Sequence, residues 1–248
     1  MKEAYGAFAA VYDQMMYDVD RDAWASYLDG FLKEAGAHDI LDCACGTGAM
    51  TIRLFQRGYH IVGSDVSDEM LSEARENARI AGAKSIVFVQ QDMRKLIVHK
   101  PIDAILSACD GVNYLTSVKE VRTFFECAAA CLKPGGLLLF DVSSPYKFSE
   151  VLGANTYTEE TEDYTYIWKN NYDPHSRLCE MNLTCFVREG AKYVRFSERH
   201  LQRAHATEEL LEALHKAGFS RTDVYGAFTK KSPTPKCERI QFAAKKGV

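Results

Sequence analysis

Residues 40–48, Ile-Leu-Asp-Cys-Ala-Cys-Gly-Thr-Gly, carry the strongest structural signal in this chain. Their apolar beginning predicts a buried strand over residues 39–43, and the pattern of residues 49–56 predicts a helix directly after the glycines. Gly46 and Gly48 lack Cβ atoms, so a ligand can lie against the backbone of the turn. The helix that follows presents free N–H groups and a partial positive charge to that ligand. The stretch therefore predicts a strand, a ligand-binding turn and a helix.

Strand and helix patterns continue to alternate on both sides of this turn. Residues 24–35 predict an amphipathic helix, Ser67 is suited to cap the next one, and Ser117 opens a capping box. A turn at residues 133–136, Lys-Pro-Gly-Gly, is expected before the last strand of this region. The predicted strands are residues 39–43, 59–64, 86–90, 102–108 and 137–142. Such alternation predicts a parallel sheet with helices on both faces.

The pattern changes after residue 142. Segments rich in Tyr and Thr predict antiparallel strands joined by turns at Asp173-Pro174 and Glu189-Gly190; these strands are residues 164–172, 178–188 and 193–202. Thr207 is expected to cap a further amphipathic helix. Two closing strands are predicted at residues 222–228 and 239–244.

These elements together predict an α/β fold with a Rossmann-like, mostly parallel seven-stranded sheet and helices on both faces. Residues 1–142 and 205–248 are expected to form this domain. Residues 143–204 are expected to form a small antiparallel β insertion that caps the sheet and faces the substrate.

Composition excludes several classes of protein. Lys and Arg total 30 against 34 Asp and Glu, a formal net charge of -4, which disfavours nucleic acid as a partner. No apolar run is long enough for a transmembrane helix, so no membrane association is expected. The eight cysteines include no CxxC pair, so we expect reduced thiols in a cytoplasmic protein and no metal site. Monomer and homodimer both remain open.

An acidic residue stands where a nucleoside ligand would need it. Asp65 ends the second predicted strand, 19 residues after Gly46. A carboxylate at this point can accept hydrogen bonds from ribose hydroxyls. Turn, strand, helix and acid together are a far more specific signal than the glycines alone.

In these features the chain resembles the class I S-adenosylmethionine-dependent methyltransferases. The motifs that carry the resemblance are residues 5–13, 41–48, 62–67, 91–93 and 132–136. The match spans residues 1–142 and resumes at 205–245. The chain departs from the family at Ala44, where glycine is frequent; a methyl group is small enough for close backbone approach to survive.

The resemblance implies S-adenosylmethionine as the cofactor and assigns residues to its methionine part. Asp42 is implied near the amino group, Gly46 and Gly48 along the methionine part with Ala44 in the same turn, and Cys109 beside the methionyl chain.

The resemblance also assigns residues to the adenosine part. Asp65 is implied at the ribose, Val66 and Met70 against the adenine, and Asp92 at the adenine amino group beside Met93. Tyr12 is implied to close over the cofactor from the N-terminal segment.

The acceptor side is less defined, and no catalytic residue is assigned. Asp110, Asn113 and Tyr114 follow the fourth strand and either contact the acceptor or form a turn. His205 is expected to be structural. In the insertion, Tyr193, Arg195, Ser197 and Arg199 share one strand face, which either points into the pocket or is solvated, and a solvated face is favoured. Other residues that the insertion offers are Tyr146, Trp168, His175 and His200.

The sequence favours an enzyme that transfers a methyl group to a small molecule, with nitrogen, oxygen and carbon acceptors all open. Alternatives are an RNA or protein methyltransferase and a non-catalytic S-adenosylmethionine-binding module. A nicotinamide-dependent dehydrogenase is disfavoured, because a carboxylate at Asp42 suits a cationic amino acid group and not a pyrophosphate.

Overall fold

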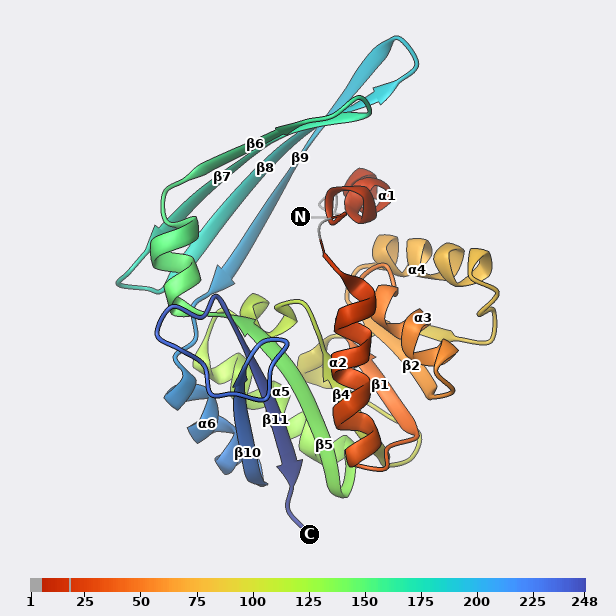
Figure 1. The fold of residues 1–248 in the computed structure, drawn as a ribbon, viewed down its shortest axis with the longest axis vertical. Helices are drawn as coiled ribbons and strands as arrows, with labels where there is room; N and C mark the ends of the chain where they lie inside the picture. Colours follow the sequence, from red (N-terminus) through yellow and green to blue (C-terminus); the bar gives the residue numbers. More distant parts are fainter. Residues whose placement is uncertain (1–5, 18) are drawn as a thin grey trace.

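The computed structural model describes residues 6–17 and 19–248, which form two separate β-sheets (Figure 1). Tyr5, in the N-terminal motif of the resemblance, lies outside the described residues. The larger sheet has seven strands in the order β10-β11-β5-β4-β1-β2-β3. These strands are β1 (Asp39–Cys43), β2 (His60–Asp65), β3 (Val87–Gln90), β4 (Ile102–Ser107), β5 (Leu132–Ser143), β10 (Phe219–Gly226) and β11 (Arg239–Lys246).

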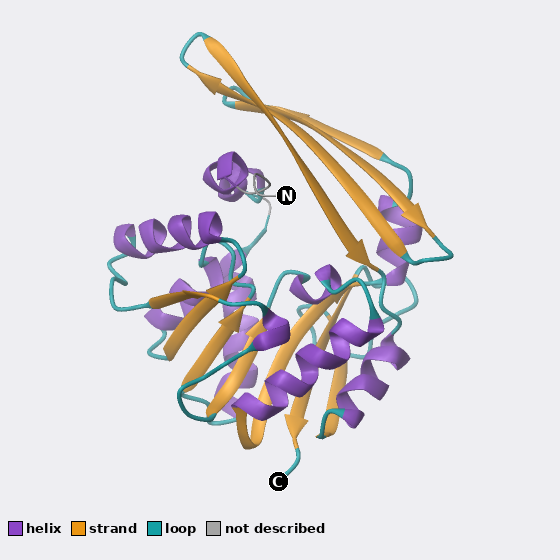
Figure 2. Ribbon diagram, turned by 180° about the vertical axis from the view of Figure 1, so that it is seen from behind, coloured by secondary structure: helices purple, strands orange, loops and turns teal. Residues whose placement is uncertain are grey.

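The sheet is parallel from β3 to β5, while β11 runs antiparallel to both β5 and β10. Helices α5 and α6 pack on one face, and α2 and α3 pack on the other (Figures 1 and 2). The helices are α1 (Gly6–Met15), α2 (Arg21–Glu34), α3 (Ala49–Gln56), α4 (Asp68–Ile80), α5 (Val118–Cys131) and α6 (Thr207–Lys216), with the short turns η1 (Met93–Lys95) and η2 (Gly111–Tyr114). The predicted mostly parallel seven-stranded sheet is confirmed.

Burial explains why the central strands are apolar without alternation. Ala104, Ile105 and Leu106 of β4 are all inaccessible to solvent, because helices cover both faces. The predicted caps also form: Ser67 Oγ accepts from Met70 N at 3.1 Å, and Ser117 Oγ accepts from Glu120 N at 3.2 Å. Local sequence thus sets these helix beginnings.

Two local predictions are wrong. Thr207 does not cap α6; it is the first helical residue, and Ala206 occupies the cap position without a side-chain bond. Instead Glu208 and Glu209 lie in the first turn, where the helix dipole favours negative charge. Residues 133–136 do not form a separate turn before the strand but lie within β5, as an irregularity in its pairing with β4. Gly135 has a φ of +73° there, which lets the strand bulge and continue.

The second sheet, called here the cap sheet, consists of four antiparallel strands in the order β6-β7-β8-β9. It lies over the end of the large sheet where the parallel strands finish, and α1 lies between it and α4 (Figures 1 and 2). Its elements are β6 (Thr156–Glu160), β7 (Tyr164–Asp173), β8 (Leu178–Glu189) and β9 (Lys192–Arg203), preceded by the π-helix η3 (Lys147–Leu152). Three of these strands match the prediction.

The edge strand β6 and the helix η3 were not predicted. β6 is mostly exposed, so its sequence lacks the alternation of apolar residues that marks a half-buried strand. No helix among the described residues combines the length and the apolar character needed to cross a membrane.

Candidate functional site

A turn with unusual backbone conformation follows β1. Ala44, Gly46 and Gly48 all have positive φ, at 59°, 54° and 77°. The Cys45 N–H donates to the carbonyl of Ser64 at 2.9 Å, which fixes the turn, residues 44–48, to the end of β2. A Cβ atom on Gly46 would meet nothing within 4 Å, so this side of the backbone is open to a ligand. For Ala44 the left-handed conformation costs on the order of 1 kcal/mol.

Asp65 connects the turn to the next strand. Its carboxylate accepts the Gly46 N–H at 2.9 Å and the Ser67 N–H at 3.0 Å. Burial raises the pKa of Asp65, although these two hydrogen bonds oppose the rise. The predicted ribose acid therefore also holds the open turn in shape, and its carboxylate retains lone pairs for further donors.

Asp42 lies beneath the turn and is almost fully buried. Its carboxylate accepts from Thr51 Oγ1 at 2.5 Å. Burial and the negative charge of Asp65 raise the pKa of Asp42 to about 7, against the hydrogen bond from Thr51. A cationic ligand group would compensate for this burial of negative charge.

The residues predicted for the adenine side have different surroundings. Asp92 caps η1 and pairs with Arg94 at 2.6 Å, and Arg94 also pairs with Glu120. The hydrogen bond from Arg94 lowers the pKa of Asp92. Met93 packs against the core of the large sheet, and Val66 is 63% exposed.

Met70 is buried and belongs to a cluster between α4, α1 and the cap sheet. Its buried partners there are Ala9, Leu183 and Cys185. It therefore links the beginning of α4 to the cap sheet.

A second strained segment follows β4. Cys109 and Asp110 both have a φ of 59°, and their N–H groups donate to the Asp141 carboxylate at 2.8 and 3.1 Å. Arg239 pairs with both Asp110 and Asp141, and its guanidinium lies 5.7 Å from the centre of the Trp24 ring. Although burial opposes ionisation, Arg239 holds the pKa of Asp110 below its ordinary value. This ion cluster fixes the loop beside the glycine turn.

Sequence reasoning missed both Asp141 and Arg239. Asp141 could have been identified from the sequence, because it is a charged residue within the apolar run of β5. A buried strand keeps an aspartate only where hydrogen-bond or ionic partners satisfy its carboxylate.

Helix α1 is attached to the same edge through Asp13, which sequence reasoning also missed. Its carboxylate accepts from Thr47 Oγ1 at 2.8 Å, Asn77 Nδ2 at 3.0 Å and Arg21 Nη2 at 2.9 Å. The preceding Tyr12 lies near the loop after β4: burial, Cys109 and Asp110 raise the pKa of its phenol. Tyr12 and the glycine turn are thus brought together.

Among the candidate acceptor residues, Asn113 and His205 have structural roles, whereas Tyr114 contacts the cap sheet. Asn113 is structural: its side chain donates to the carbonyls of Ser143 and Arg203 and accepts from Ser143 N. Tyr114 Oη lies 3.2 Å from His200 Nδ1, which joins η2 to β9. His205 is buried, with Nδ1 near Arg203, and fits the expected structural role.

The outer face of β9 is solvated, as expected. Its exposed residues are Tyr193, Arg195, Ser197 and Arg199. The inner face includes His200 and also Glu198, which is only 3% exposed and which sequence reasoning did not single out.

The sheet order, the glycine turn after β1, the acid after β2 and the antiparallel β11 define a Rossmann-like nucleoside-binding enzyme. A protein-family model described as "Methyltransferase domain" matches residues 40–136. The Bacillus subtilis (strain 168) protein YqeM, whose name assigns it to the methyltransferases, is 38% identical over 98% of this chain and 97% of its own. A glycine/sarcosine N-methyltransferase from Halorhodospira halochloris is 29% identical over 79% of this chain and 71% of its own.

The structural comparison agrees. A crystal structure of an S-adenosylmethionine-dependent methyltransferase from Clostridium acetobutylicum ATCC 824 superposes with a TM-score of 0.89 and 32% identity, covering 98% of this chain and 99% of that one. This chain belongs to the class I S-adenosylmethionine-dependent methyltransferases. It is an enzyme whose cofactor is S-adenosylmethionine, as predicted.

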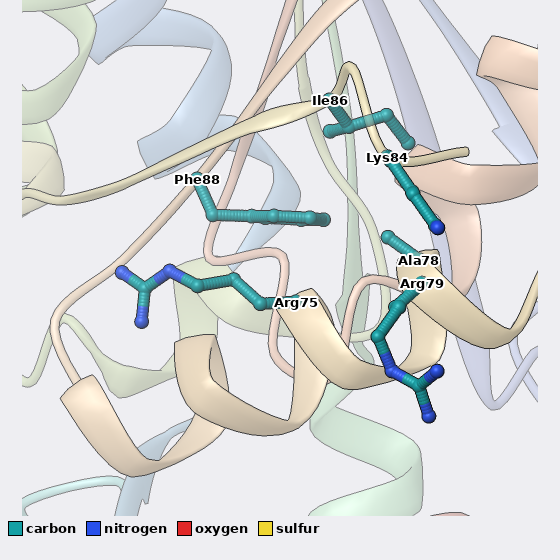
Figure 3. A pocket seen from close by; sticks show the side chains of 6 residues that line it. All are labelled: Arg75, Ala78, Arg79, Lys84, Ile86 and Phe88. Atoms are coloured by element: carbon teal, nitrogen blue, oxygen red, sulfur yellow. The ribbon is translucent and has the colours of Figure 1, made fainter. Parts of the chain in front are cut away.

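A hollow of about 310 Å³ beside α4 and β3 is not this site (Figure 3). Its lining residues are Arg75, Ala78, Arg79, Lys84, Ile86 and Phe88. These provide no carboxylate for an ammonium or ribose group, and Arg79 is already paired with Glu76.

Proposed function

We propose that this enzyme transfers the methyl group of S-adenosylmethionine to the amino nitrogen of a small molecule. The acceptor would bind between the large sheet and a substrate-facing cap formed by residues 143–204. The observation that carries the proposal is the closure of this edge by two elements, α1 through Asp13 and β9 through the Tyr114–His200 contact. Closure of this kind suits a small acceptor. The glycine/sarcosine activity in the name of the Halorhodospira relative supports an amine.

The methionine part of the cofactor would lie along Ala44, Gly46 and Gly48, with Asp42 facing its ammonium group and Cys109 beside it. The open side of Gly46 and the uncompensated burial of Asp42 support this assignment. When bound, S-adenosylmethionine supplies an electrophilic methyl group on a sulfonium.

The adenosine part would lie over the carboxyl ends of β2 and β3, which pair side by side in the sheet. Asp65 would accept from the ribose hydroxyls, for which its carboxylate keeps lone pairs. The adenine would lie near the side chains of Val66, Met70, Asp92 and Met93.

The chain itself would align the acceptor and exclude water, and Tyr12 would cover the reacting groups. An amine attacks only when it has lost its extra proton, so a site that favours the neutral amine accelerates the transfer. The net charge of -4 gives no support to an RNA acceptor.

A matched acceptor panel tests the proposal. The enzyme with S-adenosylmethionine is offered glycine, sarcosine and glucosamine beside their hydroxyl counterparts glycolate and glucose, and S-adenosylhomocysteine release is measured. We expect release with amines and none with the hydroxyl compounds. Release with a hydroxyl compound, and none with amines, would overturn the amine assignment.

A further inference from the structure

The inner face of the cap sheet holds one buried acid among apolar and aromatic side chains. Glu198 of β9 is 3% exposed and lies opposite Leu183 of β8 in the strand pairing. Leu183 packs with Met70 at the beginning of α4. Aromatic residues of the same cluster are Tyr12, Tyr166, Trp168 and Phe196. Glu198 therefore lies between the cap sheet and the cofactor-binding domain.

This carboxyl group is not satisfied within the described part of the chain. Glu198 Oε2 is buried without a hydrogen-bond partner among the described residues. A buried polar atom left in this way costs about 1–3 kcal/mol, so its retention calls for an explanation.

The charges around Glu198 are not those that would pair with it. The group whose charge acts on it is the carboxylate of Glu69, in the first turn of α4, so burial and this like charge raise the pKa of Glu198 to about 8. Of the other titratable groups, the Cys185 thiol of β8 interacts with the Glu198 carboxyl, and the His200 imidazole stands two residues further along β9 on the same face. Burial lowers the pKa of His200, which disfavours the positively charged imidazolium.

Two carboxyl groups and several aromatic rings favour one kind of ligand group. An ammonium group would neutralise the negative charge, donate to the free oxygen and lie against ring faces. A hydroxyl group would supply one hydrogen bond but no positive charge to pair with either carboxyl group. A metal ion is disfavoured, because no group of three metal-ligating side chains occurs among residues 6–17 and 19–248.

We propose that Glu198 binds the ammonium group of the methyl acceptor and so selects amines over neutral compounds. This inference rests on the proposed amine acceptor and adds the residue that recognises it. Ionised Glu198 pairs with the bound ammonium, and the proton that the empty site holds on this carboxyl goes to solvent. Before transfer the ammonium gives one proton to the Glu198 carboxylate, which leaves a neutral amine to attack the methyl group.

The test follows the Glu198 carboxyl directly. Carbon-13 NMR of the full chain labelled at glutamate carboxyl carbons is recorded against pH in methylammonium chloride and in sodium chloride of equal ionic strength. The Glu198 signal is assigned by its absence in Glu198→Gln, or in Glu198→Asp if the first variant does not fold. Glu189, exposed at the end of β8, is the matched control, assigned with Glu189→Gln.

We expect Glu198 to titrate above pH 7 in sodium chloride and its pKa to fall by about one unit in saturating methylammonium. A fall of one unit means that methylammonium binds the ionised carboxylate about tenfold more tightly than the protonated acid. The Glu189 signal should follow the same course in both salts. An unchanged pKa of Glu198, or one already in the range of exposed glutamates, overturns the inference. Because this titration needs no methyl transfer, its failure is separate from a failure of the acceptor panel.

Discussion

The two walls of the proposed active site are built in different ways. On the large sheet, the glycine turn and the loop after β4 are held by backbone hydrogen bonds, and Asp65 and Asp141 each accept from two N–H groups. On the inner face of the cap sheet, side chains form an apolar and aromatic surface with one unsatisfied acid, Glu198. The cofactor wall is thus preorganised by the main chain, whereas the acceptor wall depends on side chains. Variation of the acceptor therefore requires no change in the cofactor wall.

The largest effect is expected from removing the cation that stabilises the loop after β4. Arg239→Met leaves the buried Asp141 and the partly buried Asp110 without their cationic partner, so the free energy of unfolding should fall by about 3–5 kcal/mol in urea denaturation. Arg239 holds the pKa of Asp110 below its ordinary value. The stabilisation from the Arg239–Asp110 pair is therefore present at neutral pH, and it is lost as the pH falls through the pKa of Asp110 in the folded protein.

Arg221, which pairs with Asp223 on the surface, provides the control for this prediction. Arg221→Met should change stability by about 0–1 kcal/mol. Equal losses in the two variants would contradict the role given to the Arg239 cluster.

Next in size is the effect of blocking the open side of the turn. Gly46→Val places a branched side chain in the ligand space and strains a backbone with φ of 54°, so S-adenosylmethionine affinity should fall about 100-fold, or roughly 2.7 kcal/mol, by calorimetry. Gly190, in the β8–β9 turn, has a similar φ of 63° and equal free space. Gly190→Val should bind normally; normal binding by a folded Gly46→Val would refute the position given to the cofactor.

A smaller loss of affinity is expected at the end of β2. Asp65→Ala removes the acceptor proposed for the ribose and the acceptor of the Gly46 N–H in the turn, so binding of S-adenosylmethionine should weaken by about 1.5–3 kcal/mol. The exposed Asp68, three residues further on, is the control, and Asp68→Ala should leave affinity unchanged. If calorimetry gives the same affinity for Asp65→Ala and the parent, the ribose assignment fails.

The smallest effect concerns the departure from the family pattern. Ala44→Gly relieves the left-handed strain but loosens the unfolded chain, so a net stabilisation of about 0.5–1 kcal/mol is expected in thermal unfolding. Arg177 has the same φ of 59° in the β7–β8 turn, so Arg177→Gly is the matched variant. A similar gain in stability there would show that the gain comes from relief of the backbone conformation. A stability loss in Ala44→Gly would show that the methyl group contributes packing that outweighs the strain.

How far the sequence predicted the site depends on how local each interaction is. Asp42, Gly46 and Asp65 stand within or directly after strands whose apolar pattern is strong, and the structure gathers them at one edge. Asp13 and Arg239 were not predicted as site residues, because their partners are distant in the sequence. Arg239, for example, lies 129 residues from Asp110. No sequence pattern indicated Glu198, because its buried surroundings come from other elements: Leu183 of β8 lies opposite it, and the Glu69 carboxylate of α4 acts on it.

The sequence by itself determined the alternation of strands and helices, the turn at residues 44–48 and the acids beside it, because periodicity, caps and positive φ are properties of short segments. The cofactor followed from these segments through the resemblance they carry. Only the tertiary structure decided how the loop after β4 is held, how α1 is attached and which elements the inner face of the cap sheet packs against. These features arise from contacts between segments far apart in the chain, and no local pattern specifies such contacts.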